Sequence, residues 1–370
     1  TVYVLAQAGE TVDTSWLGGK WTVLSLEREV IGQAAELDAN EGTKTLAQYL
    51  LALVGLDLGD EAEAGRLAEF LVEKHGENSF ENSVYSDFWG YLALAEAGKL
   101  AELASEDIVD YILGKQSPDG SWGETFNGTY WPDFLATTEA IRVLQRLDPE
   151  GKDDEIQAAI QSGLTYLKGF CQEDGSVHAP WDDPVMDTAA LVIALLELGQ
   201  DPTGPEWSQS GGKTNPVTYL LARAYNEEDN SFGGLYDELL TATYALQAYI
   251  LLQDAELDAD NGSEDPITEN LDEGSGVDEK PDQEEGLQPL DRLYEGENDW
   301  EEDGSVVSRE GIQYEEEAGE EPALALGEGA DGDDGDTGTI MEGEEDPKEL
   351  ARDLAQKAVA FIRKKYDSEK

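Results

Sequence analysis

Aromatic and carboxylate side chains recur together at four places in this sequence, each close to the start of an apolar helical pattern. Carboxylates can orient a ligand, and the faces of tryptophan and tyrosine can hold a sugar, an apolar ring or a cation. We therefore expect a ligand pocket, with no catalytic residue assigned. Its candidate residues are Tyr85, Asp87, Trp89, Tyr130, Trp131, Asp133, Trp181, Asp183, Asp187, Tyr236 and Asp237.

The same residues have two other interpretations. Asp is a common helix N-cap, because its carboxylate accepts hydrogen bonds from the first backbone N–H groups, and Asp87, Asp133 and Asp187 all come close before an apolar run. The aromatic residues could then simply plug the interior. Alternatively, paired carboxylates hydrolyse glycosidic bonds when they lie ~5–10 Å apart, a separation that sequence does not give.

A second set of oxygen ligands lies in the acidic C-terminal third. Asp299, Glu301, Asp303, Ser305 and Glu310 occupy positions 1, 3, 5, 7 and 12 of an EF-hand-type loop, with Gly304 at the sharp turn. Calcium is therefore a possible cofactor. The alternative is solvated charge, since an acid-rich segment produces such spacing by chance.

A four-residue sequence motif, which we call the phrase, occurs four times and indicates the kind of fold that positions the candidate pocket. Each copy reads acid, Gly or Asn, Ser, then an apolar residue, and successive copies are 42, 55 and 55 residues apart. A period of this size marks a repeat fold whose units bury their apolar faces against one another. The copies begin at Glu77, Asp119, Asp174 and Asp229.

Helical patterns flank every copy. The preceding helix is amphipathic, whereas the helix that follows the phrase after a loop is apolar almost all round, as in 188-TAALVIALLELG. One outer and one inner helix per repeat predict an all-α fold, an α/α toroid of about five to six helix pairs over residues 1–253. The region 21–59 fits a further pair, and residues 1–6 fit the end of another.

QSPDGSW at 116–122 and PVMDTAALVIALLELG at 184–199 resemble the prenyltransferase and squalene-cyclase repeat superfamily. The order of pieces is most similar to secreted prokaryotic surface domains related to the cobalamin-carrier (intrinsic factor and transcobalamin) α/α domain. This resemblance implies the toroid fold over roughly residues 1–253. It says little about activity.

The chain departs from the residues on which the enzymes of this superfamily depend. Class II cyclases protonate their substrate with an Asp at the position that Met186 occupies here, and a thioether cannot donate a proton. Protein prenyltransferases hold zinc with Asp, Cys and His, whereas this chain has Cys171, His75 and His178 without an Asp-x-Cys pair. The cobalamin carriers use a second, β-rich domain, and no segment after 253 has such a pattern.

Composition constrains partners and compartment. A formal net charge of −60 excludes nucleic acid as a partner, because phosphate binding needs clustered Lys and Arg. Dense carboxylates on the surface suit a high-salt organism. A single cysteine gives no intrachain disulfide, and no stretch has the length of a transmembrane segment. We expect an extracellular or cell-surface protein.

Two segments follow the repeats. Residues 254–345 are rich in Gly, Asp and Glu and predict a largely disordered acidic linker. Residues 346–366 predict a basic amphipathic helix, with Pro347 at the first helical position and a stripe that includes Leu354, Ala358 and Phe361. We expect this helix to dock on its own or another toroid.

These observations favour a non-catalytic binding or surface-assembly protein. Its possible partners are a small apolar or sugar ligand and further copies of the chain. The alternatives are an enzyme of the toroid superfamily acting on an isoprenoid or polysaccharide, and a purely structural subunit of a surface layer or filament.

Overall fold

The computed structural model describes residues 2–8, 15–16, 21–209, 213–228, 231–233, 235, 237–255 and 346–368. Most of these residues are helical, which confirms the all-α prediction, and the strands are short antiparallel pairs. None of the described helices combines the length and the apolar character needed to cross a membrane.

The structure has the following elements. The helices are α1 Val2–Gln7, α2 Val23–Glu36, α3 Thr43–Gly55, α4 Ala62–Lys74, α5 Val84–Glu96, α6 Ser105–Lys115, α7 Phe134–Leu147, α8 Asp154–Lys168, α9 Pro184–Glu197, α10 Pro216–Arg223, α11 Glu238–Asp254 and α12 Pro347–Ser368, with short 3-10 turns at Leu100–Glu102 and Pro205–Trp207. The strand pairs are β1 Ser15–Trp16 with β2 Trp21–Thr22, β3 Trp122–Phe126 with β4 Thr129–Asp133, and β5 Tyr225–Asn226 with β6 Ser231–Phe232.

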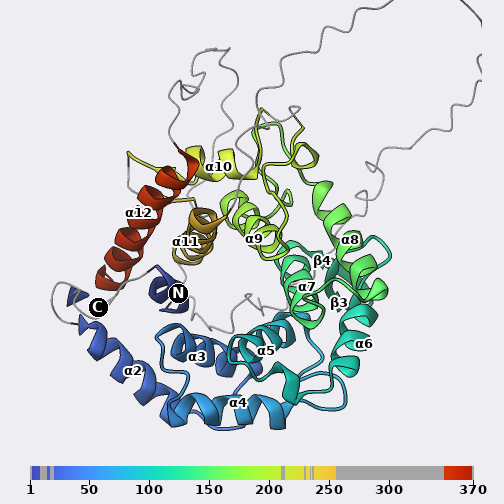
Figure 1. Ribbon diagram of the computed structural model, residues 1–370, viewed down its shortest axis with the longest axis vertical. Coiled ribbons are helices and arrows are strands. Elements are labelled where there is room, and N and C mark those ends of the chain that lie inside the picture. The colour runs from blue at the N-terminus through green and yellow to red at the C-terminus, as the bar shows by residue number, and fades with distance from the viewer. Residues whose placement is uncertain are drawn as a thin grey trace, which may run out of the picture. The chain divides into compact units, whose positions relative to one another are not determined.

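The odd-numbered helices form a closed series of contacts. α1 packs on α3, α3 on α5, α5 on α7, α7 on α9, α9 on α11, and α11 on α1 again. The even-numbered helices pack against this series, and Figure 1 shows α4, α6, α8, α10 and α12 outside it. The expected pair in the region 21–59 is present as α2 and α3.

The burial of side chains also differs between the inner, odd-numbered helices and the outer, even-numbered helices. Every residue of α9 from Val185 to Leu195 is buried, so this helix is enclosed on all sides. In the outer helix α8, by contrast, Asp154 and Glu155 stand in the first turn while Ile156, Ile160 and Leu164 are buried along one face. The apolar and amphipathic patterns of the sequence therefore separate inner from outer helices.

The second and third copies of the repeated phrase each form a tight turn that packs against the following repeat. Oδ1 of Asp119 accepts hydrogen bonds from the backbone N–H of Ser121 at 3.0 Å and its hydroxyl at 2.6 Å, and Asp174 holds Ser176 in the same way. Gly120 and Gly175 between them have φ of 94° and 92°. Trp122 follows the turn, is fully buried, and donates from Nε1 to the carbonyl oxygen of Ile112 at 2.7 Å.

Substitution at Gly120 tests this turn. A Cβ there would lie 2.4 Å from the carbonyl oxygen of Ser162 in α8, and a positive φ is unfavourable for alanine. We expect Gly120→Ala to lower the free energy of unfolding by about 2–4 kcal/mol, measured by urea denaturation. Gly128→Ala is the matched control: φ is also positive, but nothing lies within 4 Å, so about 1 kcal/mol is expected. Equal losses at the two positions would argue against the close packing of turn and helix.

A β-hairpin lies between the second phrase and its inner helix, in the stretch that we expected to be a loop leading into that helix. β3 and β4 pair from Trp122↔Asp133 to Phe126↔Thr129, and Asn127 and Gly128 form the turn with φ of 51° and 82°. Two positive φ values in succession define the hairpin turn that Asn-Gly favours. Of the aromatic residues on this hairpin, Trp122 is buried against the helices, whereas Phe126 and Trp131 are exposed.

The described residues up to Ala255 and helix α12 belong to one compact unit. α12 packs against α11 and α10, and it buries a stripe that includes Leu354, Ala358, Phe361 and Ile362. The rings of Phe361 and Phe232 lie 5.9 Å apart. Residues 256–345, which hold most of the expected acidic linker, lie outside the described residues.

Candidate functional site

Large apolar side chains that are exposed in the described part of the chain precede the beginnings of inner helices. Three of them, Trp131, Trp181 and Leu235, stand two residues before Asp133, Asp183 and Asp237, the N-caps of α7, α9 and α11. We call these three residues together with Phe126 the apolar rim. Their exposed fractions are 54% for Phe126, 53% for Trp131, 50% for Trp181 and 66% for Leu235.

The hairpin orients the first two members of the rim. In its register Glu124 is opposite Trp131 and Phe126 is opposite Thr129, so these side chains share one face of the hairpin. Glu124 is held in place because its Oε1 accepts a hydrogen bond from the backbone N–H of Val84, the first residue of α5. This face of the hairpin is therefore tied to the beginning of α5.

Carboxylates beneath the rim cap helices, as the structural interpretation of the sequence proposed. Asp133 accepts from the N–H of Ala136 at 2.8 Å and is 5% exposed. Oδ1 of Asp183 accepts from two backbone N–H groups of α9, while its Oδ2 accepts from the N–H of Leu235 and the hydroxyl of Thr241. Asp183 therefore joins the beginnings of α9 and α11.

Asp87 and Asp187 are not N-caps, contrary to expectation, because each lies inside the first turn of its helix. Both are 0% exposed. One oxygen of Asp87 accepts from the N–H of Glu81 and one of Asp187 from the N–H of Ala179, while the second oxygen of each makes no hydrogen bond with the described residues. Burial raises the pKa of both carboxyls, and for Asp187 the charge of Asp182 adds to the effect.

The other predicted site residues are dispersed. Tyr130 lies on β4 with its hydroxyl 3.0 Å from Oγ of Ser121. Trp89 is a half-buried residue of α5 whose ring lies 5.6 Å from Nζ of Lys44, and Tyr85 lies in the first turn of α5. Tyr236 and the predicted calcium ligands lie outside the described residues. Within the described ranges, no group of three or more His, Cys, Asp or Glu is placed to hold a metal ion.

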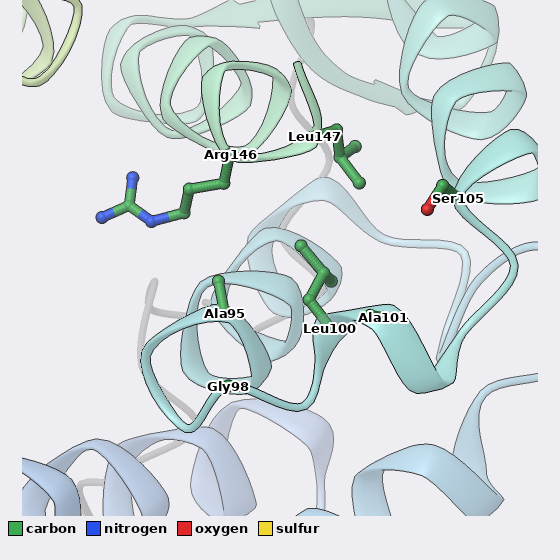
Figure 2. Close-up of a pocket in the computed structure, with 7 residues that line it drawn as sticks. All are labelled: Ala95, Gly98, Leu100, Ala101, Ser105, Arg146 and Leu147. Carbon is green, nitrogen blue, oxygen red and sulfur yellow. The ribbon is translucent and has the colours of Figure 1, made fainter. Parts of the chain in front are cut away.

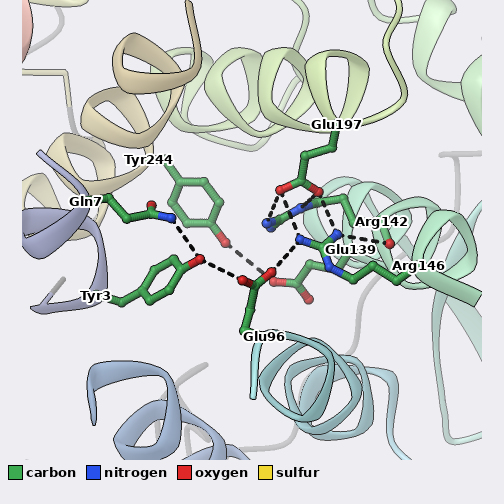
Figure 3. Close-up of polar contacts among 8 residues, drawn as sticks. All are labelled: Tyr3, Gln7, Glu96, Glu139, Arg142, Arg146, Glu197 and Tyr244. Atoms are coloured by element: carbon green, nitrogen blue, oxygen red, sulfur yellow. Dashed lines mark hydrogen bonds and ion pairs between the residues drawn. The ribbon is translucent and has the colours of Figure 1, made fainter. Parts of the chain in front are cut away.

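A network of ion pairs, which was not predicted from the sequence, links four inner helices (Figure 3). Arg142 in α7 donates to both carboxylate oxygens of Glu197 in α9, each at 2.8 Å. Arg146, one turn later, donates to Glu197 and to Glu96 of α5, also at 2.8 Å. Tyr3 of α1 donates to Glu96 at 3.1 Å. The network therefore connects α1, α5, α7 and α9.

The two arginines of this network keep the carboxylate of Glu197 charged. Burial alone would raise the pKa of Glu197, but the charges and hydrogen bonds of Arg142 and Arg146 lower it to about 2. The carboxylate therefore stays ionised at physiological pH. Its side chain is 17% exposed and that of Arg142 is 13% exposed, so both partners are largely withdrawn from water.

Glu139 of α7 is a buried carboxyl whose pKa is raised to near neutrality. It is 6% exposed, and the hydroxyl of Tyr244 in α11 donates to its Oε1 at 3.4 Å. Burial raises the pKa of Glu139 to about 7, against the opposing charges of Lys44 and Arg142. A carboxyl with such a pKa can exchange protons near neutral pH, which is the property of a general acid or base.

The raised pKa of Glu139 predicts a pH dependence of stability. Its ordinary value is 4.5, so between pH 4.5 and about 7 the folded state binds the proton more tightly than the unfolded chain. The free energy of unfolding therefore falls as pH rises through this window, by up to about 3 kcal/mol. Glu139→Gln should remove this contribution and be more stable than the parent at pH 8, measured by urea denaturation. Identical pH profiles for parent and variant would contradict the assignment, and Glu102→Gln on the surface is the control.

Two cavities open near the ends of these elements. One of about 430 Å³ is lined by Ala95, Gly98, Leu100, Ala101, Ser105, Arg146 and Leu147 (Figure 2). The Arg146 side chain extends away from Leu147 in Figure 2, and its guanidinium is engaged by Glu96 and Glu197. Another of about 540 Å³ lies beside the hairpin, where Lys115 donates to the carbonyl oxygen of Asn82. Neither cavity contains a member of the apolar rim.

Comparisons of the chain with protein-family models, curated proteins and solved structures give no match. The resemblance to the prenyltransferase and squalene-cyclase superfamily therefore stays a prediction that rests on the quoted motifs.

Proposed function

We propose that the helices form an α/α toroid with alternating inner and outer helices, as in the superfamily that the motifs resemble. The closed series of contacts from α1 through α11 and back to α1 supports this arrangement. α12 then supplies the outer layer over α11, after the long acidic segment.

We further propose that this toroid is a non-catalytic binding protein whose binding surface is the apolar rim. The observation that carries the proposal is the gathering of half-exposed Trp131, Trp181 and their neighbours at the beginnings of consecutive inner helices. Grouped exposed apolar side chains cost solubility and are characteristic of interaction sites. In the proposal the protein works outside the cell at high salt, where a net charge of −60 keeps the rest of its surface hydrated.

The surroundings of the rim support binding over catalysis. Asp133 accepts a hydrogen bond from the backbone N–H of Ala136, and Asp183 accepts from backbone N–H groups and from the hydroxyl of Thr241. Met186 at the cyclase acid position is a buried thioether. The interior charges of Arg142 and Glu197 pair with each other. An enzyme proposal would have to rest on the buried carboxyls with raised pKa, which include Glu139, Asp87 and Asp187.

Native mass spectrometry of the protein isolated from the cells that make it tests the proposed function. We expect a bound non-protein ligand at a fixed ratio, with at least a tenfold loss of occupancy in the Trp131→Ala, Trp181→Ala double variant. Phe70→Ala, a half-buried aromatic on the outer helix α4, should retain the ligand. An empty parent protein, or a double variant with unchanged occupancy, would contradict the proposal.

A further inference from the structure

The turn of the β3–β4 hairpin carries a motif that the proposed binding function does not use. Asn127, Gly128 and Thr129 have the order Asn-x-Thr, which is the acceptor sequence for N-linked glycosylation. The turn itself accounts for the first two residues, because two successive positive φ values favour Asn-Gly. Of residue 129, the first of β4, the turn requires only that it suit a strand. The hydroxyl of Thr129 therefore completes an acceptor that the turn does not need.

The structure leaves this acceptor accessible. Every residue from Thr125 to Thr129 is exposed, and neither the Asn127 amide nor the Thr129 hydroxyl makes a hydrogen bond with the described residues. Asn215, by contrast, is 6% exposed because its side chain caps α10. A Cβ at Gly128 would meet nothing within 4 Å. The end of the hairpin therefore has space for a bulky group on Asn127.

Phe126 offers a surface for the first sugar of such a group. Its side chain directly precedes Asn127 and is 54% exposed. Phe126 pairs with Thr129 across the hairpin, so both side chains project from the same face, on either side of the turn. The face of an aromatic ring carries partial negative charge and attracts the C–H groups on one face of a pyranose. A sugar at this turn can thus cover a ring that otherwise faces water.

We propose that Asn127 is a site of N-linked glycosylation and that the first sugar of its glycan packs against Phe126. The inference rests on the extracellular location in the proposed function, because acceptors of this kind belong to secreted proteins. The donor is an oligosaccharide joined through C1 to a lipid phosphate or diphosphate, used by a transferase. Nδ2 of Asn127 forms a bond to C1, the bond from C1 to the phosphate oxygen breaks, the lipid phosphate leaves, and one Nδ2 proton passes to the transferase.

The glycan and the proposed ligand occupy different parts of the apolar rim. Trp131 pairs with Glu124, two cross-strand pairs further from the turn than Phe126, or about 7 Å along the strand. A first sugar on Phe126 therefore leaves Trp131 to the ligand. The modification also hydrates the end of the hairpin, where an aromatic side chain is exposed.

Peptide mapping by mass spectrometry of the protein isolated from the cells that make it tests the modification. We expect a glycan on the tryptic peptide 116–142, which separates Asn127 from the second acceptor sequence at Asn261. The glycan should be absent from Asn127→Gln and from Thr129→Val, which keeps the β-branched shape but has no hydroxyl. Thr129→Ser restores a hydroxyl and should be modified. Thr125→Val, on the same hairpin but outside the acceptor, should be modified like the parent.

Location is measured separately, so that the two proposals fail in distinguishable ways. The chain is sought in the medium, and lysines exposed on intact cells are labelled with a reagent that does not cross membranes. An extracellular parent with an unmodified Asn127 overturns the glycosylation and leaves the binding function in place. A parent that is found only inside the cell overturns the extracellular location and the glycosylation together. A glycan that persists in Thr129→Val overturns the acceptor assignment.

The packing against Phe126 is tested with and without the glycan. The parent and Phe126→Ala are each prepared from the native cells, with Asn127 glycosylated, and from a cytoplasmic expression host, without the glycan. We expect the glycan to raise the urea midpoint of the parent, and this rise to fall by about half or more in Phe126→Ala. An equal rise in both proteins overturns the contact between the sugar and Phe126.

Discussion

Arg142→Ala is expected to lower the free energy of unfolding by about 3–5 kcal/mol, one of the largest losses for a single substitution in this protein. The substitution leaves the carboxylate of Glu197 largely buried with Arg146 as its remaining cation. It also removes one of the two charges that oppose the raised pKa of Glu139. The measurement is urea denaturation at neutral pH, followed by circular dichroism.

A double substitution separates the cost of an orphaned charge from the value of the ion pair. In Arg142→Met, Glu197→Met no carboxylate is left behind, and apolar side chains of similar size can fill the space. We expect the double variant to be more stable than Arg142→Ala by about 2 kcal/mol or more. If both variants lose the same amount, the ion pair itself is the stabilising element and the argument from desolvation is wrong.

A surface pair provides the control. Lys99 and Glu102 are close to half exposed and form an ion pair one helical turn apart. Because water and salt screen such a pair, Lys99→Ala should leave the urea midpoint unchanged. A comparable loss there would mean that the assay reports charge in general and not burial.

The helices and the turns of this fold could be predicted from the sequence, because both are set by local chemistry. The phrase at Asp119 gives the turn that its residue types require, with a left-handed glycine and an Asp that holds the following Ser. The hairpin was missed although Asn127-Gly128 is a strong signal for a two-residue turn. The strands on either side were assigned to the approach to the next helix.

The ion-pair network was missed for a different reason. Glu96, Arg142 and Glu197 come from three repeats, and their pairing depends on which faces of the inner helices meet. A usable signal was present, since these charges interrupt helices that are otherwise apolar. Asp87 was placed wrongly because α5 begins earlier than expected, at Val84, whose N–H is bonded by Glu124 from the next repeat. Because Glu124 is 40 residues away from Val84 in the sequence, the residues around the helix start do not reveal this hydrogen bond.

The C-terminal helix α12, which follows the repeats in the sequence, packs against the repeats of its own chain. Its apolar stripe was evident from spacing, but sequence left open whether it docks on its own chain or on another. In the structure Phe361 and Ile362 are buried against the unit that holds α10 and α11, and Phe361 meets Phe232 of β6. Lys357 pairs with Glu227 at 3.2 Å and Lys365 pairs with Glu238.

Phe361→Ala is therefore expected to lower the free energy of unfolding of the whole unit by about 3–5 kcal/mol, as for other buried aromatic residues. The loss arises because the substitution leaves a cavity over α11, which is itself part of the inner series of helices. Urea denaturation, followed both by circular dichroism and by protease resistance of the chain, measures it. Arg352→Ala on the exposed face of α12 is the matched control, expected within about 0.5 kcal/mol of the parent.

The number of steps in the urea unfolding transition shows whether α12 unfolds together with the rest of the unit or before it. If α12 is the outer helix of the last repeat, Phe361→Ala shifts one cooperative transition without splitting it, because α11 cannot stay folded with its outer face uncovered. If α12 is an accessory segment, the variant loses the helix in an early step while the main transition keeps its midpoint. High salt should weaken the two lysine pairs but not the apolar contact of Phe361, so docking of α12 is expected to persist when the ion pairs are screened.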